Sequence, residues 1–71
     1  MWHRFVVSDK EVCPGKFVSI FDKQDGVPMT YVIIKKMAIG PDKYYLFLQH
    51  AITGRVKDFC IFSDQELTIR N

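Results

Sequence analysis

The chain has 71 residues, which is enough for one small domain, because a chain this short buries only about 60% of the surface that its unfolded form exposes. Hydrophobic residues make up 48% of the sequence and charged residues 25%, a balance that excludes disordered and collagen-like proteins. The formal net charge of +2 is too small to indicate a dedicated nucleic-acid binder.

The N-terminal part of the chain, residues 1–13, is expected to form an arm or an edge strand, with the strand itself at residues 2–7. Its apolar run is shorter than the core of a secretory signal peptide, and no segment is long and apolar enough for a membrane span. The two cysteines, Cys13 and Cys60, make no disulfide framework, so free thiols are favoured over a Cys13–Cys60 disulfide. We therefore expect a cytoplasmic protein without membrane contact.

Turn-forming residues divide the rest of the chain into short runs. Proline, glycine and aspartate mark breaks at residues 13–16, 25–28, 40–43 and 53–54. The runs between them are rich in β-branched and aromatic residues and predict strands at residues 17–21, 31–39, 44–49, 55–62 and 67–69. No run keeps a helical period, so an antiparallel meander is favoured and a long helix is not.

Two local patterns refine this expectation. Residues 63–66, Ser-Asp-Gln-Glu, fit a capping box and predict one helical turn before the last strand. Lys35 and Lys36 are adjacent, so one of them must share a face with apolar neighbours unless the strand bulges or bends. Lys57 and Asp58 pose the same conflict in a later strand. Because bulges and bends let a small sheet close on itself, these conflicts favour a barrel.

The opening at residues 14–20, two hairpins that turn near Gly40 and Gly54, and the ending at residues 62–69 together resemble an SH3-like small β-barrel. The resemblance covers residues 14–70 and implies one all-β domain over residues 1–71. That domain would be a five- or six-stranded antiparallel barrel, with Leu67 as a core anchor of the closing strand. Stand-alone barrels of this size are similar to small accessory proteins of phages, prophages and photosynthetic electron-transfer complexes.

The main alternative architecture is an OB-fold. It would ordinarily place a helix between its third and fourth strands, and residues 50–54 are too few to form one.

The sequence holds no arrangement typical of a metal site or an active site. His3, Cys13, His50 and Cys60 are of the residue types that bind zinc, but no spacing preorganises them. We interpret Cys60 as a small buried residue and Cys13 as part of a solvent-facing turn. The acidic residues fall mostly in turns, and the glycines are scattered singly rather than gathered in a phosphate-binding loop. The prediction is a protein that is not an enzyme and uses no cofactor, metal or small-molecule substrate.

Residues 31–57 hold five basic residues against one acidic residue, Asp42. The strands of a meander are neighbours, so these cations are expected to gather beside aromatic side chains. A single closed sheet of this size also has too few interior places for ten aromatic residues, unless the N-terminal segment covers the remainder. The predicted contact surface comprises apolar contacts from Tyr31, Tyr45 and Phe47 and steering charges from Lys35, Lys36 and Lys57.

These features predict a non-catalytic interaction module, an accessory or regulatory protein of the kind that phages and mobile elements encode. The expected partner is a protein or a second copy of the chain. The alternative partner is single-stranded DNA or RNA, which interleaved cations and aromatic rings also suit. A third interpretation is that the lysines only solvate outer faces and edge strands.

Overall fold

The structure, a computed structural model, describes residues 1–21 and 26–71. Within them, six antiparallel strands form a single sheet without any helix. The strands are β1 (His3–Val6), β2 (Phe17–Phe21), β3 (Pro28–Ala38), β4 (Lys43–His50), β5 (Val56–Phe62) and β6 (Glu66–Arg70). The predicted all-β class and antiparallel pairing are confirmed. The break predicted at residues 25–28 begins with Asp25, which lies outside the described residues.

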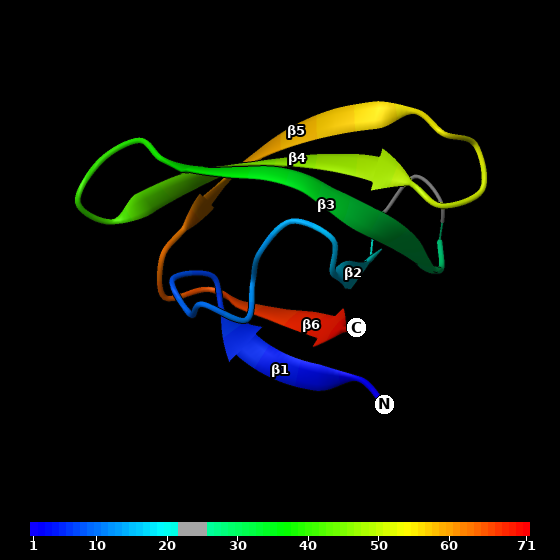
Figure 1. The fold of residues 1–71 in the computed structure, drawn as a ribbon, viewed down its shortest axis with the longest axis horizontal. Coiled ribbons are helices and arrows are strands. Elements are labelled where there is room, and N and C mark those ends of the chain that lie inside the picture. Colours follow the sequence, from blue (N-terminus) through cyan, green and yellow to red (C-terminus); the bar gives the residue numbers. More distant parts are fainter. Residues whose placement is uncertain (22–25) are drawn as a thin grey trace.

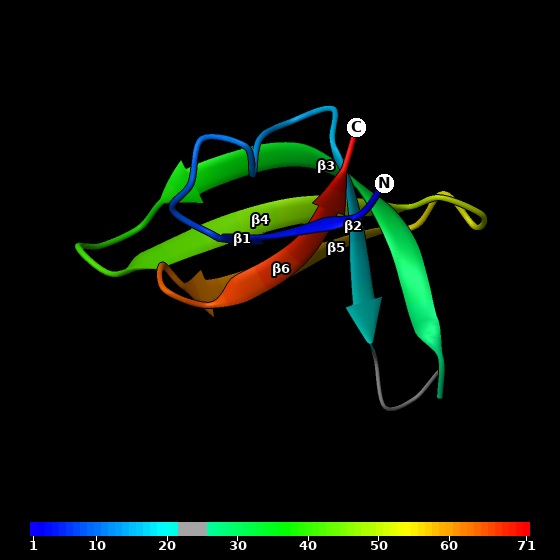
Figure 2. The ribbon, with the colours of Figure 1, turned by 90° about the horizontal axis from the view of Figure 1, so that it is seen from below.

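The strands follow the order β1-β6-β2-β3-β4-β5 across the sheet. Strands β2 to β5 form a meander, and β6 returns to lie between β1 and β2 (Figure 1). The sheet folds over on itself, so that β1, β2 and β6 lie across β3, β4 and β5 (Figure 2). Strands β1 and β5 remain as edges and do not pair with each other, so the sheet is not closed.

No helix that is long and apolar enough to cross a membrane occurs in the described part of the chain.

Strand β3 carries the irregularity that its adjacent lysines predict. Ile33 pairs with Leu48 of β4 and Lys35 pairs with Phe47, so Ile34 has no opposite residue and the register shifts there. This bulge reverses which residues of β3 face outward. The conflict at residues 57–58 is resolved differently, because the pairing of β4 with β5 is continuous. Strand β5 is an edge strand in which both residues are exposed, so no bulge is required.

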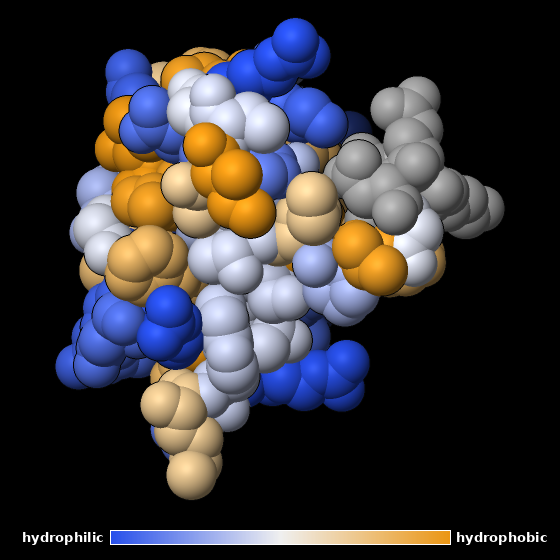
Figure 3. Space-filling view, turned by 90° about the vertical axis from the view of Figure 1, so that its right-hand side faces the viewer, coloured by the Kyte–Doolittle hydropathy of each residue, from blue (hydrophilic) through white to orange (hydrophobic). Residues whose placement is uncertain are grey.

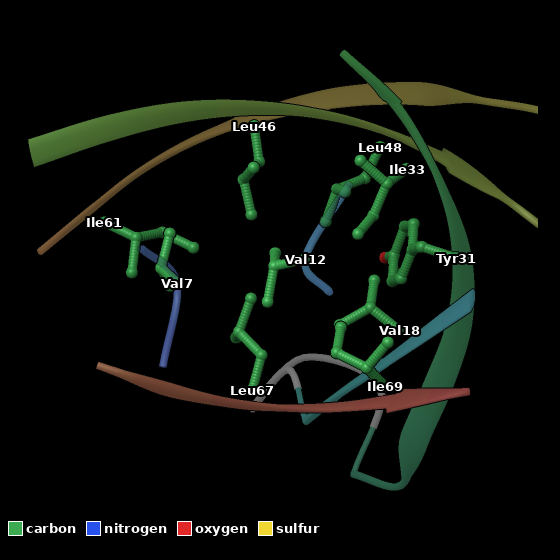
Figure 4. Close-up of a cluster of buried hydrophobic side chains, with 10 residues drawn as sticks. All are labelled: Val7, Val12, Val18, Tyr31, Ile33, Leu46, Leu48, Ile61, Leu67 and Ile69. Carbon is green, nitrogen blue, oxygen red and sulfur yellow. The ribbon is translucent and has the colours of Figure 1, made fainter. Parts of the chain in front are cut away.

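The hydrophobic core lies between the two parts of the folded sheet (Figure 4). Val7 and Val12, from the segment between β1 and β2, are both fully buried in this core. Leu67 is also buried, as predicted for the anchor of the last strand. The buried core residues are Val7, Val12, Val18, Tyr31, Ile33, Leu46, Leu48, Ile61, Leu67 and Ile69. The N-terminal segment therefore completes the core and does not cover the outer side of β3, β4 and β5.

The connection between β5 and β6 is a tight turn, and the predicted helical turn is not confirmed. The amide of Gln65 donates to the carbonyl of Phe62 at 3.1 Å, which closes the turn within four residues. Glu66 is already the first residue of β6. Its carboxylate lies 3.8 Å from the guanidinium of Arg4 on the neighbouring strand β1. The carboxylate of Glu66 thus takes part in an ion pair between β1 and β6 instead of a helix cap.

Candidate functional site

The side of β3, β4 and β5 that faces away from the core is rich in aromatic and apolar side chains. Successive residues of a strand face opposite sides, and residues paired directly across two antiparallel strands share a side. We call this surface the outer aromatic face. Its residues are Lys35, Met37, Lys43, Tyr45, Phe47, Asp58, Cys60 and Phe62.

Tyr45 and Phe47 form the centre of the outer aromatic face. Their ring centroids are 6.0 Å apart and their planes differ by 8°, so the two rings stack. Both side chains are half-buried, although they point away from the core. Phe47 lies between Lys35 of β3 and Asp58 of β5, which places one charge of each sign beside the ring. The centre is therefore an apolar surface with charged borders.

Two ammonium groups lie over rings of this face. The Nζ atom of Lys35 is 5.9 Å from the ring centroid of Phe47, and that of Lys43 is 5.2 Å from the centroid of Phe62. A cation over an aromatic face is attracted by the ring quadrupole. Since Phe62 keeps 54% of its surface exposed, this pairing leaves apolar area accessible to a partner.

Most aromatic residues of the chain remain partly accessible. Of the ten tryptophan, tyrosine and phenylalanine residues, all of which the structure describes, Tyr31 alone is buried. The core is therefore built mainly from aliphatic side chains, and the aromatic residues are distributed around it. This arrangement agrees with the expectation that a small sheet cannot enclose all of them.

The six residues predicted to bind a partner lie in four places. Lys35, Tyr45 and Phe47 lie together on the outer aromatic face. Tyr31 is 1% exposed and belongs to the core, so it is not an outer contact residue. Lys57 lies on the opposite side of β5 from Asp58 and lines a pocket together with Tyr31.

Lys36, the sixth residue, points to the inner side of the sheet after the bulge. Its Nζ donates a hydrogen bond to the carbonyl oxygen of Asp9 at 3.0 Å and lies 4.9 Å from the ring centroid of Tyr44. Desolvation by burial lowers the pKa of Lys36, opposed by the nearby Cys13 and Asp9. Its contacts are therefore internal, and its charge is not presented on the outer aromatic face.

Five residues of this face were not among the predicted contact residues: Met37, Lys43, Asp58, Cys60 and Phe62. The signal for Cys60 and Phe62 was their even spacing from Asp58 along one strand, which places all three on the same side. Cys60 was expected to be buried, but it is exposed, because it pairs with Tyr45 on the outward side of an edge strand. Cys13 is half-buried, and neither cysteine forms a disulfide.

No group of three or more histidine, cysteine or acidic side chains that could hold a metal ion occurs in residues 1–21 and 26–71. Comparison of the chain with protein-family models, with curated proteins and with solved structures finds no match. The fold and the site thus define a class and no particular family: a small all-β protein with one aromatic, cation-bordered sheet face.

Proposed function

We propose that this chain is a non-catalytic interaction module that binds a protein partner through the outer aromatic face. The observation that carries the proposal is the stacked pair of Tyr45 and Phe47, which stays partly exposed on a sheet whose core is complete without it. Exposed aromatic residues gathered on one surface are typical of protein contact sites, where they supply much of the binding free energy.

The charges on this face favour one kind of partner. Lys35 and Lys43 are both exposed and flank the aromatic centre, whereas Asp58 is its one acidic residue. Complementary charges across an interface raise the association rate and select the partner. The partner surface is therefore expected to combine an apolar centre with acidic residues at its border.

Retention of a partner from extract of the source cells tests this proposal. Tagged wild-type chain, Tyr45→Ala and Phe47→Ala are compared by quantitative mass spectrometry, with Phe21→Ala as the control. Phe21 is the matched control because it is 62% exposed and lies on β2, which pairs with neither β4 nor β5. We expect a protein whose retention falls about tenfold or more in both outer-face variants and is unchanged in the control, as for loss of a binding hot spot.

Two results would contradict the proposal. One is the same set of retained proteins for the wild type and both outer-face variants. The other is loss of the folded state in both variants, seen as loss of cooperative thermal unfolding, since Tyr45 and Phe47 would then be structural residues rather than contact residues.

A second copy of the chain is the other protein partner that this face suits. Sedimentation velocity over a concentration series separates this case from binding to a different protein. Self-association through the outer aromatic face is expected to disappear in Phe47→Ala and to persist in Phe21→Ala.

A second candidate function is binding of single-stranded nucleic acid. It is favoured by the stacked rings with Lys35 beside them, because bases stack on exposed aromatic side chains while cations attract the phosphates. Asp58, which pairs with Phe47, counts against it by repelling phosphate. This function predicts that the affinity for an oligothymidylate falls steeply as salt is raised. A salt-independent affinity, or no binding at low salt, would exclude it.

We also propose that the sheet belongs to the SH3-like barrel class. The return of β6 beside β2, the first strand of the meander, supports this assignment, and so does the bulge in β3. The edge strands β1 and β5 are unpaired in the structure, so a closed barrel would require them to pair in solution, and amide exchange tests this. In a closed barrel, the amides of β1 and β5 that point away from their neighbouring strands are expected to exchange slowly. Fast exchange of both sets of amides would show that the sheet is open and would contradict the barrel assignment.

A further inference from the structure

A pocket of about 460 Å³ opens on the inner side of the sheet, beside the connection between β4 and β5. It is separate from the outer aromatic face, and no residue of that face lines it. Its lining residues are Met29, Tyr31, His50, Thr53, Arg55 and Lys57. Four of these six residues are polar or charged, so the pocket offers hydrogen-bond donors beside an apolar part.

His50 is held in one orientation at this pocket. Its side chain is 8% exposed, and its Nδ1 atom accepts hydrogen bonds from the amides of Ile52 and Thr53, each at 3.1 Å. Because Nδ1 is the acceptor in both bonds, the ring proton of the neutral imidazole is on Nε2. The ring of Tyr31 packs edge-on against it, with centroids 5.1 Å apart. His50 is thus a fixed donor of one hydrogen bond through Nε2.

The other polar groups of the pocket are also donors. Arg55 offers a planar guanidinium, which matches the geometry of phosphate oxygens. Thr53 accepts a hydrogen bond from the amide of Arg55 at 3.3 Å, so its hydroxyl proton is left to donate. Lys57 also lines the pocket, and none of the lining residues that the structure describes carries a carboxylate. The guanidinium of Arg55, the imidazole of His50 and the hydroxyl of Thr53 are the donors on which this site depends.

The surface around the β4–β5 connection carries both hydrophobic and hydrophilic residues. Figure 3 views the side on which the β4–β5 connection, the end of β2 and the start of β3 lie. Hydrophobic residues there are separated by hydrophilic ones instead of forming one apolar patch. Such a surface suits a small polar ligand better than an apolar protein contact.

We infer that the Tyr31–His50–Arg55–Lys57 pocket binds a phosphate group, with Arg55 and His50 as its main donors. Met29, which is partly exposed at the pocket, provides the apolar wall against which an organic part of the ligand, such as a nucleoside, packs. The pocket lies on the other side of the sheet from the proposed protein contact, so the two proposals are tested separately. A negative result for one of them does not contradict the other.

Titration of the ¹⁵N-labelled full chain tests this inference by nuclear magnetic resonance. The probes are inorganic phosphate, adenosine monophosphate and a short oligothymidylate, each compared with chloride at equal ionic strength. The amide signals of Ile52, Thr53 and Arg55 are expected to shift and saturate with phosphate but not with chloride. Tighter binding of adenosine monophosphate than of phosphate identifies a nucleotide as the source, and still tighter binding of the oligonucleotide identifies a nucleic-acid strand.

Two variants with the same change of charge make the test specific. Arg55→Gln removes a donor from the pocket, whereas Arg4→Gln removes an exposed arginine that pairs with Glu66 on strand β6. Arg55→Gln is expected to weaken phosphate binding about tenfold and Arg4→Gln to leave it unchanged. Equal weakening in both variants would show that net charge alone attracts the anion. That result, or a lack of saturation in the wild type, would overturn the inference.

Discussion

Lys36 of β3 donates a hydrogen bond from Nζ to the carbonyl oxygen of Asp9 at 3.0 Å, and so ties the centre of the sheet to the segment between β1 and β2. The same segment places Val7 and Val12 in the core. A cation that would ordinarily lie in solvent therefore holds the N-terminal part of the chain in position over the hydrophobic interior.

The partial burial of Lys36 predicts a pH-dependent contribution to stability. Desolvation lowers the pKa of Lys36 from 10.5 in the folded chain. At pH values between the lowered pKa and 10.5, Lys36 binds more protons in the unfolded chain than in the folded chain. Its contribution to the free energy of unfolding therefore increases as pH rises through this range. Denaturant unfolding of the wild type and Lys36→Met measures the effect. The difference in free energy of unfolding is expected to shift in favour of the wild type as pH approaches 10.5. Parallel pH profiles of the two chains would contradict the burial of this charge.

Neighbouring residues of β4 are expected to differ sharply in their contribution to stability. Leu46→Ala removes a fully buried side chain and should cost about 2–5 kcal/mol. Phe47→Ala removes a half-buried ring from the outer aromatic face and should cost about 1 kcal/mol, the order of a lost stacking contact. Urea unfolding of both variants tests this order. A larger cost for Phe47 would place that ring in the core.

Gly54 is expected to resist substitution because of its backbone conformation. Its φ of +75° lies in the left-handed region, so Gly54→Ala should destabilise the fold by about 1–2 kcal/mol. Gly40→Ala is the matched control, because φ there is not in this region and no atom lies within 4 Å of an added Cβ. Equal melting temperatures for the two variants would be inconsistent with this account of the β4–β5 turn.

The His50 side chain is expected to stabilise the β4–β5 connection. His50→Ala removes the acceptor of two backbone amides, Ile52 and Thr53, and should cost about 2 kcal/mol at roughly 1 kcal/mol per hydrogen bond. Hydrogen exchange of both amides should accelerate. Gln49→Ala serves as the control, because it removes one exposed hydrogen bond to Gly54. Unchanged exchange at Ile52 and Thr53 in His50→Ala would refute the assigned role of Nδ1.

Cys60 offers a chemical test of the outer aromatic face. Its exposed thiol is expected to react with N-ethylmaleimide faster than the half-buried thiol of Cys13. The added group lies beside Tyr45 and should block partner binding without unfolding the chain. Mass spectrometry of Cys13→Ser and Cys60→Ser gives the two rates. Faster reaction of Cys13, or full binding after modification of Cys60, would speak against this surface.

Strand positions could be predicted from the sequence because turn residues and β-branched runs are local signals. The strand at Phe17–Phe21 was predicted with its observed bounds, and the other strands differ mainly at their ends. The helical turn at residues 63–66 was not confirmed, because Glu66 pairs in β6 instead of capping a helix. Strand pairing joins residues that are far apart in the sequence, so it could not be predicted from the four residues of the capping pattern.

The site was only partly predictable, because one bulge decides which residues share a face. In a regular strand, every second residue faces the same side, so Tyr31, Ile33 and Lys35 would share one side. The bulge between Ile33 and Lys35 leaves Tyr31 inside and turns Lys35 outward, beside Phe47. The adjacent lysines signalled that a bulge was needed. They did not specify the residue at which it falls, since that depends on the register with β4.

The position of β6 has a consequence for the synthesis of the protein. Strand β6 pairs with β1 on one side and with β2 on the other, although both partners leave the ribosome long before it. In a nascent chain that has not yet reached residue 66, β1 has no strand to pair with and β2 has an unpaired edge. Until the final strand emerges, these backbone groups are open to any extended peptide, a neighbouring nascent copy included.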